Sequence, residues 1–350
     1  MSEAEPVILR PKLVGAELEL TTRCPCQCTT CGTAAGVPRP HELTLARWQE
    51  LLHELVALGC QRVTLLGGEP LCFEGWADLA RYGADLGLAV EIVTSGVTVD
   101  AETARRAREA GLASITVSVD GTREVHDRQR RVPAAFDKAL TAIRLLDSVG
   151  LRVGVTTQVN QLSLPSLEAL APRLEAAGAI GWQVQLTFPM GRARHCGIEL
   201  APEHVPELRA VLGRLARRFG LRPFLTDSIG YWTDDDLLLR TPQGGRARPW
   251  LQCLAGLRHV GIASNGDVKG CLALWDAFTE GNVNVEPLAR IWQDPARFAY
   301  TRQYRHELLS GPCADCPHGD LCRGGCTAVA VAYHQRPGIC THCFRLHEER

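Results

Sequence analysis

Residues 44–68 read TLARWQELLHELVALGCQRVTLLGG, and this stretch shows the unit from which much of the chain is built. Apolar residues recur at helical spacing over residues 45–56, with Thr44 as the expected N-cap and Gly59 as the stop signal. The run that follows, residues 62–66, is β-rich and ends in two glycines. The stretch therefore predicts a helix followed by a strand.

The same alternation continues on both sides of this stretch. Strands are expected at residues 16–22, 62–66, 90–94, 115–119, 152–159 and 182–186. Helices are expected at residues 44–58, 76–86, 101–110, 133–149, 163–177 and 203–219. Such alternation predicts parallel strands joined by helical crossovers, in either an open doubly wound sheet or a partial barrel. Both place a functional site at the carboxyl ends of the strands.

The alternation stops near residue 220, where loop-like sequence begins. We expect an N-terminal extension over residues 1–15 and an α/β domain over residues 16–225. A linker is expected over residues 226–249, followed by a cysteine-rich domain of short strands and turns over residues 250–350.

Composition narrows the class of protein. The 350 residues include 38 Lys and Arg against 39 Asp and Glu, so there is no polycationic surface for nucleic acid or an acidic membrane. Neither a secretory signal nor a membrane-spanning apolar run is visible, which predicts a cytoplasmic protein. Thiols stay reduced there, so we expect the 15 cysteines to bind metals or to act in catalysis.

A first cysteine motif follows the first expected strand. Cys24, Cys28 and Cys31 have the spacing C-x3-C-x2-C. Three thiolates on one loop can each bind one iron of a [4Fe–4S] cluster, which leaves the fourth iron open to a small molecule. A zinc loop completed by Cys26 or by a distant residue is the alternative.

Two further motifs also stand at expected strand ends. Residues 67–70 read GGEP, and their glycines allow either close approach to a ligand or a simple turn. Ser118 and Asp120 belong to a second motif, SVDG, which Arg130 follows. Such side chains suit a ligand with hydroxyl and carboxylate groups, although a capped turn with a surface ion pair has the same residues.

Together with the turn at residues 94–96, TSG, these motifs resemble the radical S-adenosylmethionine (radical SAM) superfamily in order and strand context. The resemblance implies a partial (β/α)6 TIM-like barrel over roughly residues 16–220. It implies that Cys24, Cys28 and Cys31 hold a [4Fe–4S] cluster whose open iron binds the methionine moiety of SAM. The cofactor contacts that it implies are Gly67, Gly68 and Glu69 at the amino group, Ser118 at the ribose, Arg130 at the carboxylate, Asn160 near the adenosine, and Ser95 in the turn.

Eight more cysteines lie in the C-terminal region. They form the patterns C-x12-G-x4-C and C-x2-C-x5-C-x3-C, followed by a last pair: Cys253, Cys271, Cys313, Cys316, Cys322, Cys326, Cys340 and Cys343. Eight thiolates can hold two four-iron clusters, and four-cysteine zinc sites are the alternative.

This pattern resembles the SPASM extension of radical SAM enzymes. The resemblance implies that Cys253, Cys271 and Cys326 bind a first auxiliary cluster. It implies a second cluster on Cys313, Cys316 and Cys322, completed by Cys340 or Cys343. The other member of that pair either completes the first cluster or stays free.

The resemblance also implies the chemistry. We expect reductive cleavage of SAM to a 5′-deoxyadenosyl radical, which takes a hydrogen atom from the substrate. Most SPASM relatives act on peptides, so we expect oxidative modification or C–S or C–C cross-linking of a ribosomally made peptide. The electron would come from a flavodoxin-type or ferredoxin-type donor. Only residues 1–15 precede the first strand, so a separate leader-peptide-binding protein or direct recognition by the barrel is expected.

Two other functions stay open at this point. One is a radical SAM dehydrogenase or epimerase of a small molecule or peptide, and the other is a zinc-stabilised α/β binding protein. Cys72 and Cys196 follow strand ends and are candidate hydrogen-atom donors to a substrate radical, with a packed, inert thiol as the alternative for each.

Overall fold

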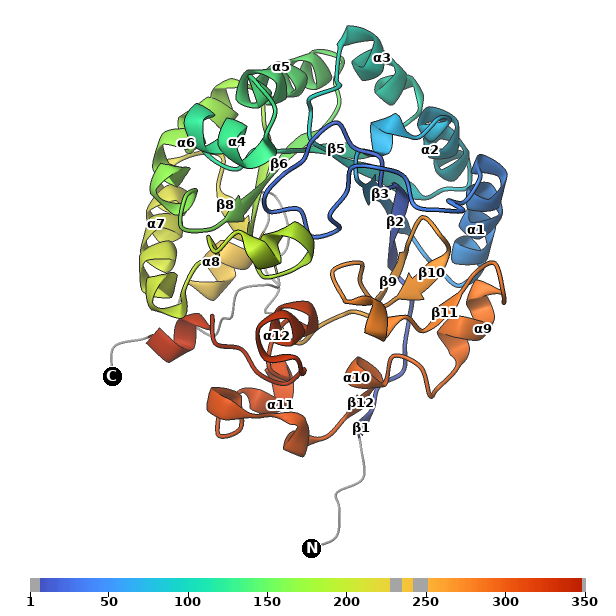
Figure 1. Cartoon of the computed structure of the whole chain (residues 1–350), viewed down its shortest axis with the longest axis vertical. Helices are drawn as coiled ribbons and strands as arrows, with labels where there is room; N and C mark the ends of the chain where they lie inside the picture. Colours follow the sequence, from blue (N-terminus) through green and yellow to red (C-terminus); the bar gives the residue numbers. More distant parts are fainter. Residues whose placement is uncertain (1–6, 227–234, 242–250, 348–350) are drawn as a thin grey trace, which may run out of the picture.

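The computed structural model describes residues 7–226, 235–241 and 251–347, and it contains all six expected strand–helix pairs (Figure 1). The parallel strands are β2 (Gly15–Thr21), β3 (Arg62–Gly67), β4 (Ala89–Thr94), β5 (Ser114–Ser118), β6 (Val153–Val159) and β7 (Gly181–Leu186). The paired helices are α1 (Leu45–Ala57), α2 (Trp76–Asp85), α3 (Ala101–Glu109), α5 (Ala135–Ser148), α6 (Leu167–Ala176) and α7 (Val205–Arg218).

Strand order decides between the two expected architectures. From β2 to β7 the strands are neighbours in the order in which they occur in the chain, and β8 (Pro223–Leu225) continues that order. A doubly wound sheet would instead reverse its direction at a switch point. The sheet curves with its helices on the outside and stays open on one side, as a partial barrel does (Figure 1).

Local sequence explains how each helix forms and packs against the barrel sheet. In α1 the side chain of Thr44 accepts a hydrogen bond from the Arg47 N–H, as expected of an N-cap. The apolar face of α1 buries Trp48, Leu51 and Leu55 against the sheet. The core continues around the barrel, because each helix contributes a similar apolar stripe.

The C-terminal region closes part of the open side. Strand β9 (His259–Ile262) pairs in parallel with β2, so it extends the barrel sheet at its free edge. The remaining elements are β10 (Asp267–Lys269), β11 (Gly281–Asn282), α9 (Leu288–Gln293), α10 (Ala299–Arg302), β12 (Gln303–Tyr304), α11 (Gly319–Cys322) and α12 (Thr327–His334). The N-terminal extension takes part as well, because β1 (Val7–Ile8) pairs antiparallel with β12.

Within the described part of residues 16–241, three strands or α-helices were not predicted from the sequence. They are β8, a helix α4 (Arg123–Arg130) between β5 and α5, and a short helix α8 (Asp236–Arg240) within the expected linker. Residues 227–234 and 242–250 of that linker lie outside the described residues.

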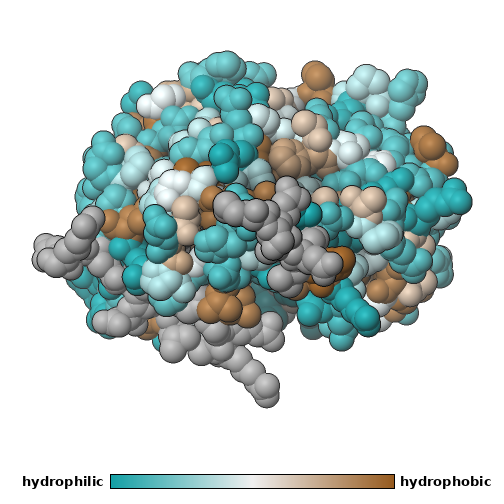
Figure 2. Space-filling view, turned by 90° about the horizontal axis from the view of Figure 1, so that it is seen from below, coloured by the Kyte–Doolittle hydropathy of each residue, from teal (hydrophilic) through white to brown (hydrophobic). Residues whose placement is uncertain are grey.

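The face shown in Figure 2 is mostly hydrophilic, with small and separate hydrophobic groups. Within the described ranges, none of the helices has the length and apolar character needed to cross a membrane.

Candidate functional site

A cavity of about 420 Å³ lies at the carboxyl ends of the barrel strands, where the fold class predicts the site. The loop that follows β2 lies across the middle of the barrel opening (Figure 1). Its cysteines line the cavity together with the predicted residues Gly67, Gly68, Ser95, Ser118 and Arg130. The structure therefore brings four separate sequence motifs to one place.

The cysteine loop suits iron–sulfur ligation. The Cys24 Sγ accepts the N–H of Cys26 at 3.4 Å, and the Cys31 Sγ accepts the N–H of Ala35 at 3.3 Å. The Cys28 Sγ lies 3.7 Å from an Arg130 Nη1. N–H donors and a nearby cation favour thiolates, which are the form that binds iron. The hydrogen bond with Cys26 and burial raise the pKa of the Cys28 thiol, and Arg130 counteracts part of that rise.

A preformed single-ion site is a different matter. Within the described ranges, no three His, Cys, Asp or Glu side chains converge to hold one metal ion. Cysteines that hold a four-iron cube bind different irons, so they have no need to converge in this way. The arrangement is therefore compatible with a cluster held by these cysteines.

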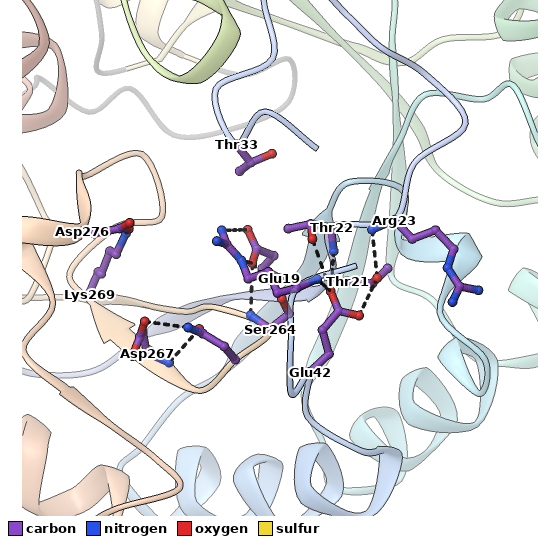
Figure 3. Close-up of polar contacts among 12 residues, drawn as sticks. Glu19, Thr21, Thr22, Arg23, Thr33, Glu42, Ser264, Asp267, Lys269 and Asp276 are labelled. Carbon is purple, nitrogen blue, oxygen red and sulfur yellow. Dashed lines mark hydrogen bonds and ion pairs between the residues drawn. The ribbon is translucent and has the colours of Figure 1, made fainter. Parts of the chain in front are cut away.

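A polar network fixes the start of the cysteine loop (Figure 3). The Glu42 carboxylate accepts hydrogen bonds from the Thr21 hydroxyl and the Thr22 N–H, each at 2.8 Å. The buried Glu19 accepts from Arg39 Nε at 2.8 Å and from the Ser264 hydroxyl at 3.0 Å. Because Ser264 follows β9, the C-terminal region helps to place the loop.

A second clamp comes from the segment after β7. Arg192 Nε donates to the Cys28 carbonyl at 2.8 Å, and Arg192 Nη1 donates to the Ala35 carbonyl at 2.7 Å. Gly191 has φ +54°, and a Cβ there would collide with the Gly32 carbonyl. The loop is thus held from both sides of the barrel opening.

Glu69 joins the glycine motif to the next strand end. Its buried carboxylate accepts from the Thr94 hydroxyl at 2.8 Å, and from the Ser95 hydroxyl and N–H at 2.5 and 2.9 Å. Burial raises the pKa of Glu69, and these donors counteract part of that rise. The side chains of Glu69 and Ser95 therefore bind each other, while Gly67 and Gly68 line the cavity.

Arg130 is positioned by a buried ion pair. Its Nη2 lies 2.6 Å from the Asp120 carboxylate, which also accepts the N–H of Gln158. The residue after it, Arg131, is in the left-handed conformation at φ +54°. The predicted contact of Arg130 with a cofactor carboxylate stays a prediction.

Asn160 and the two candidate hydrogen-atom donors, Cys72 and Cys196, lie outside the set of described residues that line the central cavity. The fully buried Asn160 amide donates to Gln129 at 3.0 Å and to Thr187 at 3.1 Å. Cys72 ends a short 3-10 helix, and the Cys196 thiol donates to the Ala193 carbonyl at 3.0 Å. Asn160, Cys72 and Cys196 are not among the described residues that line the cavity, so their assigned roles stay predictions.

Sequence reasoning missed several lining residues. Gln158, Gln183, Gln185 and Thr187 line the cavity from β6, β7 and the residue after it, and Glu17 lines it from β2. A usable signal was present, because polar and buried apolar residues alternate along β7. In a parallel strand covered by helices on its outer side, such polar positions face the barrel interior.

The C-terminal cysteines form two groups. Cys253, Cys271 and Cys326 line a neighbouring cavity of about 490 Å³, and the last two also line the central cavity. In the other group, the Cys313 Sγ accepts the Cys340 N–H at 3.3 Å. The three predicted ligands of the first auxiliary cluster therefore lie together, beside the barrel opening.

Comparison with known families agrees with this geometry. The radical SAM superfamily matches residues 18–161, and the SPASM iron–sulfur cluster-binding domain matches residues 253–317. The chain belongs to the radical SAM superfamily and carries a SPASM domain. It is an enzyme that binds SAM at a [4Fe–4S] cluster and holds auxiliary iron–sulfur clusters. This assignment replaces the zinc-stabilised binding protein as the interpretation of the cysteine motifs.

Curated relatives cover most of the chain. It is 28% identical to the AdoMet-dependent heme synthase of Oleidesulfovibrio alaskensis, across 93% of this chain and 86% of that protein. It is 29% identical to the mycofactocin maturase MftC of Mycobacterium ulcerans, across 89% and 82%. Identity is 31% to the Fe-coproporphyrin III synthase of Methanosarcina barkeri, across 90% and 83%.

The fold of this chain is also similar to that of a solved structure. Streptococcus suis SuiB bound to the precursor peptide SuiA superposes with a TM-score of 0.74 at 17% identity, across 95% of this chain and 75% of that one. At this identity the similarity concerns the fold.

In the superfamily, the reduced cluster supplies the electron that cleaves the sulfonium of SAM.

Proposed function

We propose that this enzyme oxidatively modifies a ribosomally made peptide. The observation that carries the proposal is the amide-rich lining of the central cavity. Gln158 and Gln185 lie opposite each other on β6 and β7, and Gln183 lies one lumen-facing position earlier on β7. Each amide offers both donors and an acceptor, which matches the groups along a peptide backbone.

Charge argues against the main competing substrate class. Two of the relatives are named for heme and for Fe-coproporphyrin III, and such iron tetrapyrroles carry several carboxylates. Carboxylates are normally bound by uncommitted arginines or lysines. Among the described lining residues, the cation is Arg130, which is paired with Asp120. Among the residues that the structure describes, the lining is therefore better matched to a peptide than to a polyanionic macrocycle.

Two relatives supply the precedent. One is named a maturase, and SuiB is described in complex with a precursor peptide. In this proposal a flavodoxin-type or ferredoxin-type protein supplies the electron, and a separate protein presents the leader of the peptide. An iron tetrapyrrole is the second candidate substrate, because of the 31% identity to the Fe-coproporphyrin III synthase.

The test compares the two substrate classes directly. Anaerobically reconstituted enzyme is mixed with SAM, dithionite and either a synthetic peptide translated from any short reading frame beside its gene or Fe-coproporphyrin III. We expect 5′-deoxyadenosine with both, since uncoupled cleavage is common chemistry for the cofactor. We expect a product lighter by a pair of hydrogen atoms only with the peptide. A tetrapyrrole product together with an unchanged peptide contradicts the proposal.

A variant links the result to the cavity. Gln185→Leu keeps the size of the side chain and removes its amide, so we expect the KM for the peptide to rise about tenfold, the effect of one lost hydrogen bond of about 1.4 kcal/mol. Gln61→Leu is the matched control, because Gln61 is exposed and precedes β3 at the opposite end of the barrel. Equal KM values in the two variants contradict the assigned role of the glutamines.

A further inference from the structure

The eight SPASM cysteines divide unequally between their two groups. Cys253, Cys271 and Cys326 line one cavity, which the other described cysteines do not reach. A four-iron cluster has four irons to ligate, and three cysteines leave one iron without a thiolate. The last two cysteines of the sequence are the obvious candidates for the missing ligand.

The structure places both candidates with the second group. The Cys340 N–H donates to the Cys313 Sγ at 3.3 Å. Cys343, Cys313 and Cys322 all lie near enough to Cys340 to act electrostatically on its buried thiol. Cys343 and Cys316 act on Cys313 in the same way. Five cysteines therefore gather at the second site, and the first keeps three.

A carboxylate lies where the first group lacks a cysteine. Glu17, on β2, lines the same cavity as Cys253, Cys271 and Cys326. Its carboxylate accepts a hydrogen bond from the side chain of Cys271 and, at 3.2 Å, from the N–H of Leu272. Its other oxygen lies 3.5 Å from His259 Nε2. The side chain is thus half-buried beside one of the three expected ligands.

We propose that Glu17 is the fourth ligand of the auxiliary cluster held by Cys253, Cys271 and Cys326. The proposal rests on the SPASM assignment and does not depend on the identity of the substrate. In it, His259 is a positioning residue that orients the carboxylate, as partners of metal-bound carboxylates commonly do.

This ligand would give the cluster a distinctive iron. Carboxylate oxygen is a harder and weaker ligand for iron than thiolate sulfur, so the position exchanges more readily than an all-cysteine one. Glu17 and Cys271 line the central cavity as well as the neighbouring one. A cluster bound by Glu17 and Cys271 would therefore have its exchangeable position beside the central cavity.

The test uses the full chain with Cys28→Ala as the parent, because loss of the SAM-binding cluster removes the other iron that lacks a thiolate. The anaerobically reconstituted parent should hold about 8 Fe per chain. We expect ⁵⁷Fe Mössbauer spectra to show an oxygen-ligated site equal to about one iron in eight. Added Glu17→Cys should convert this site to the all-thiolate type and keep the iron content. If the spectrum of the parent shows no oxygen-ligated iron, the proposal is overturned.

Three further variants separate ligation from general damage. Glu17→Gln should change the g values of one reduced cluster in electron paramagnetic resonance spectra. The control is Glu91→Gln, on the lumen-facing side of β4 below the cavity-lining Val93, and its spectrum should superpose on that of the parent. His259→Ala should retain the oxygen-ligated iron. If His259→Ala changes the g values of that cluster and Glu17→Gln does not, histidine is the ligand and the proposal is wrong.

Discussion

At Gly68 two stretches of backbone approach so closely that even a methyl group has no room. A Cβ at this position would lie 2.5 Å from the Arg23 carbonyl oxygen and 2.6 Å from that of Thr22. Both neighbours are backbone atoms at the start of the cysteine loop, so the loop itself would have to move. The glycine is thus explained by chain packing as well as by an approach to a ligand.

We therefore expect Gly68→Ala to displace the cysteine loop and to weaken its cluster. Reconstituted wild type should contain about 12 Fe per chain if all three clusters hold four irons, and the variant should lose about 4 of them. Iron and sulfide analysis measures this loss. Gly36→Ala is the control in the same loop, because a methyl group at Gly36 would have no atom beyond its chain neighbours within 4 Å. Equal iron losses in both variants would contradict the packing argument.

His126 gives the molecule a specific pH dependence. Its fully buried ring accepts the Asp120 N–H at 3.0 Å, and burial, followed by the charge of Arg130, lowers the pKa of His126 to about 4. An unfolded histidine titrates near 6.5, so the unfolded chain binds more protons between these values. Stability from this group is full above about pH 6.5 and is lost as the pH falls toward 4.

Between about pH 7.5 and about pH 5.5 this group alone should lower the free energy of unfolding by about 1.3 kcal/mol. His126→Gln removes the titration and keeps a hydrogen-bond acceptor. Anaerobic urea unfolding of both proteins at the two pH values measures the effect. The stability difference between wild type and variant should shrink by that amount at the lower pH, and a constant difference would rule out His126 as the cause.

At the scale of elements, the contact between β2 and the turn after β9 joins the barrel to the C-terminal region. Glu19, 1% exposed, accepts hydrogen bonds from Arg39 and from both the N–H and the hydroxyl of Ser264 (Figure 3). Glu19→Gln keeps the shape and removes the charge. We expect a loss of about 2 kcal/mol in the free energy of unfolding, because a partly buried cation loses its partner.

Glu50→Gln is the matched control for that variant. Glu50 pairs with Arg47 on the exposed side of α1, and such surface pairs contribute less than about 1 kcal/mol. Urea unfolding of both variants compares the two sites. A Glu19→Gln protein as stable as the Glu50→Gln protein would show that the link between β2 and the β9 turn carries little of the stability.

Local patterns predicted the six barrel strands and their helices, since periodicity reports directly which face of an element is buried. They did not predict the pairing of β9 with β2, because strand partners far apart in sequence leave no local trace. The motifs identified Cys24, Gly68 and Ser118 as cavity residues. The glutamines of β7 were missed although they alternate with buried neighbours, because the polar face was not interpreted as barrel lumen.

Across the whole molecule, the two regions depend on different forces. The barrel core is continuous and includes apolar residues of β9, β10 and α9, such as Ile262, Val268 and Trp292. The second buried cluster contains Cys253, Ala255, Leu274 and Ala328, and it is far smaller. Residues 311–343 hold most of the SPASM cysteines among short helices and turns. Their order should come from the clusters, because metal binding supplies the folding energy of small cysteine-rich modules.

Iron removal should therefore unfold the chain unevenly. In the protein stripped of iron by a chelator under reducing conditions, we expect residues 311–343 to lose amide protection at least tenfold, a local destabilisation of about 1.4 kcal/mol or more. Strands β4 to β6, and β9 on the barrel edge, should keep theirs, since apolar packing holds them. Hydrogen exchange followed by mass spectrometry of peptides measures both regions in one sample. Unchanged protection of residues 311–343 would mean that side-chain packing orders this region, whereas equal loss in β4 to β6 would mean that the clusters stabilise the entire molecule.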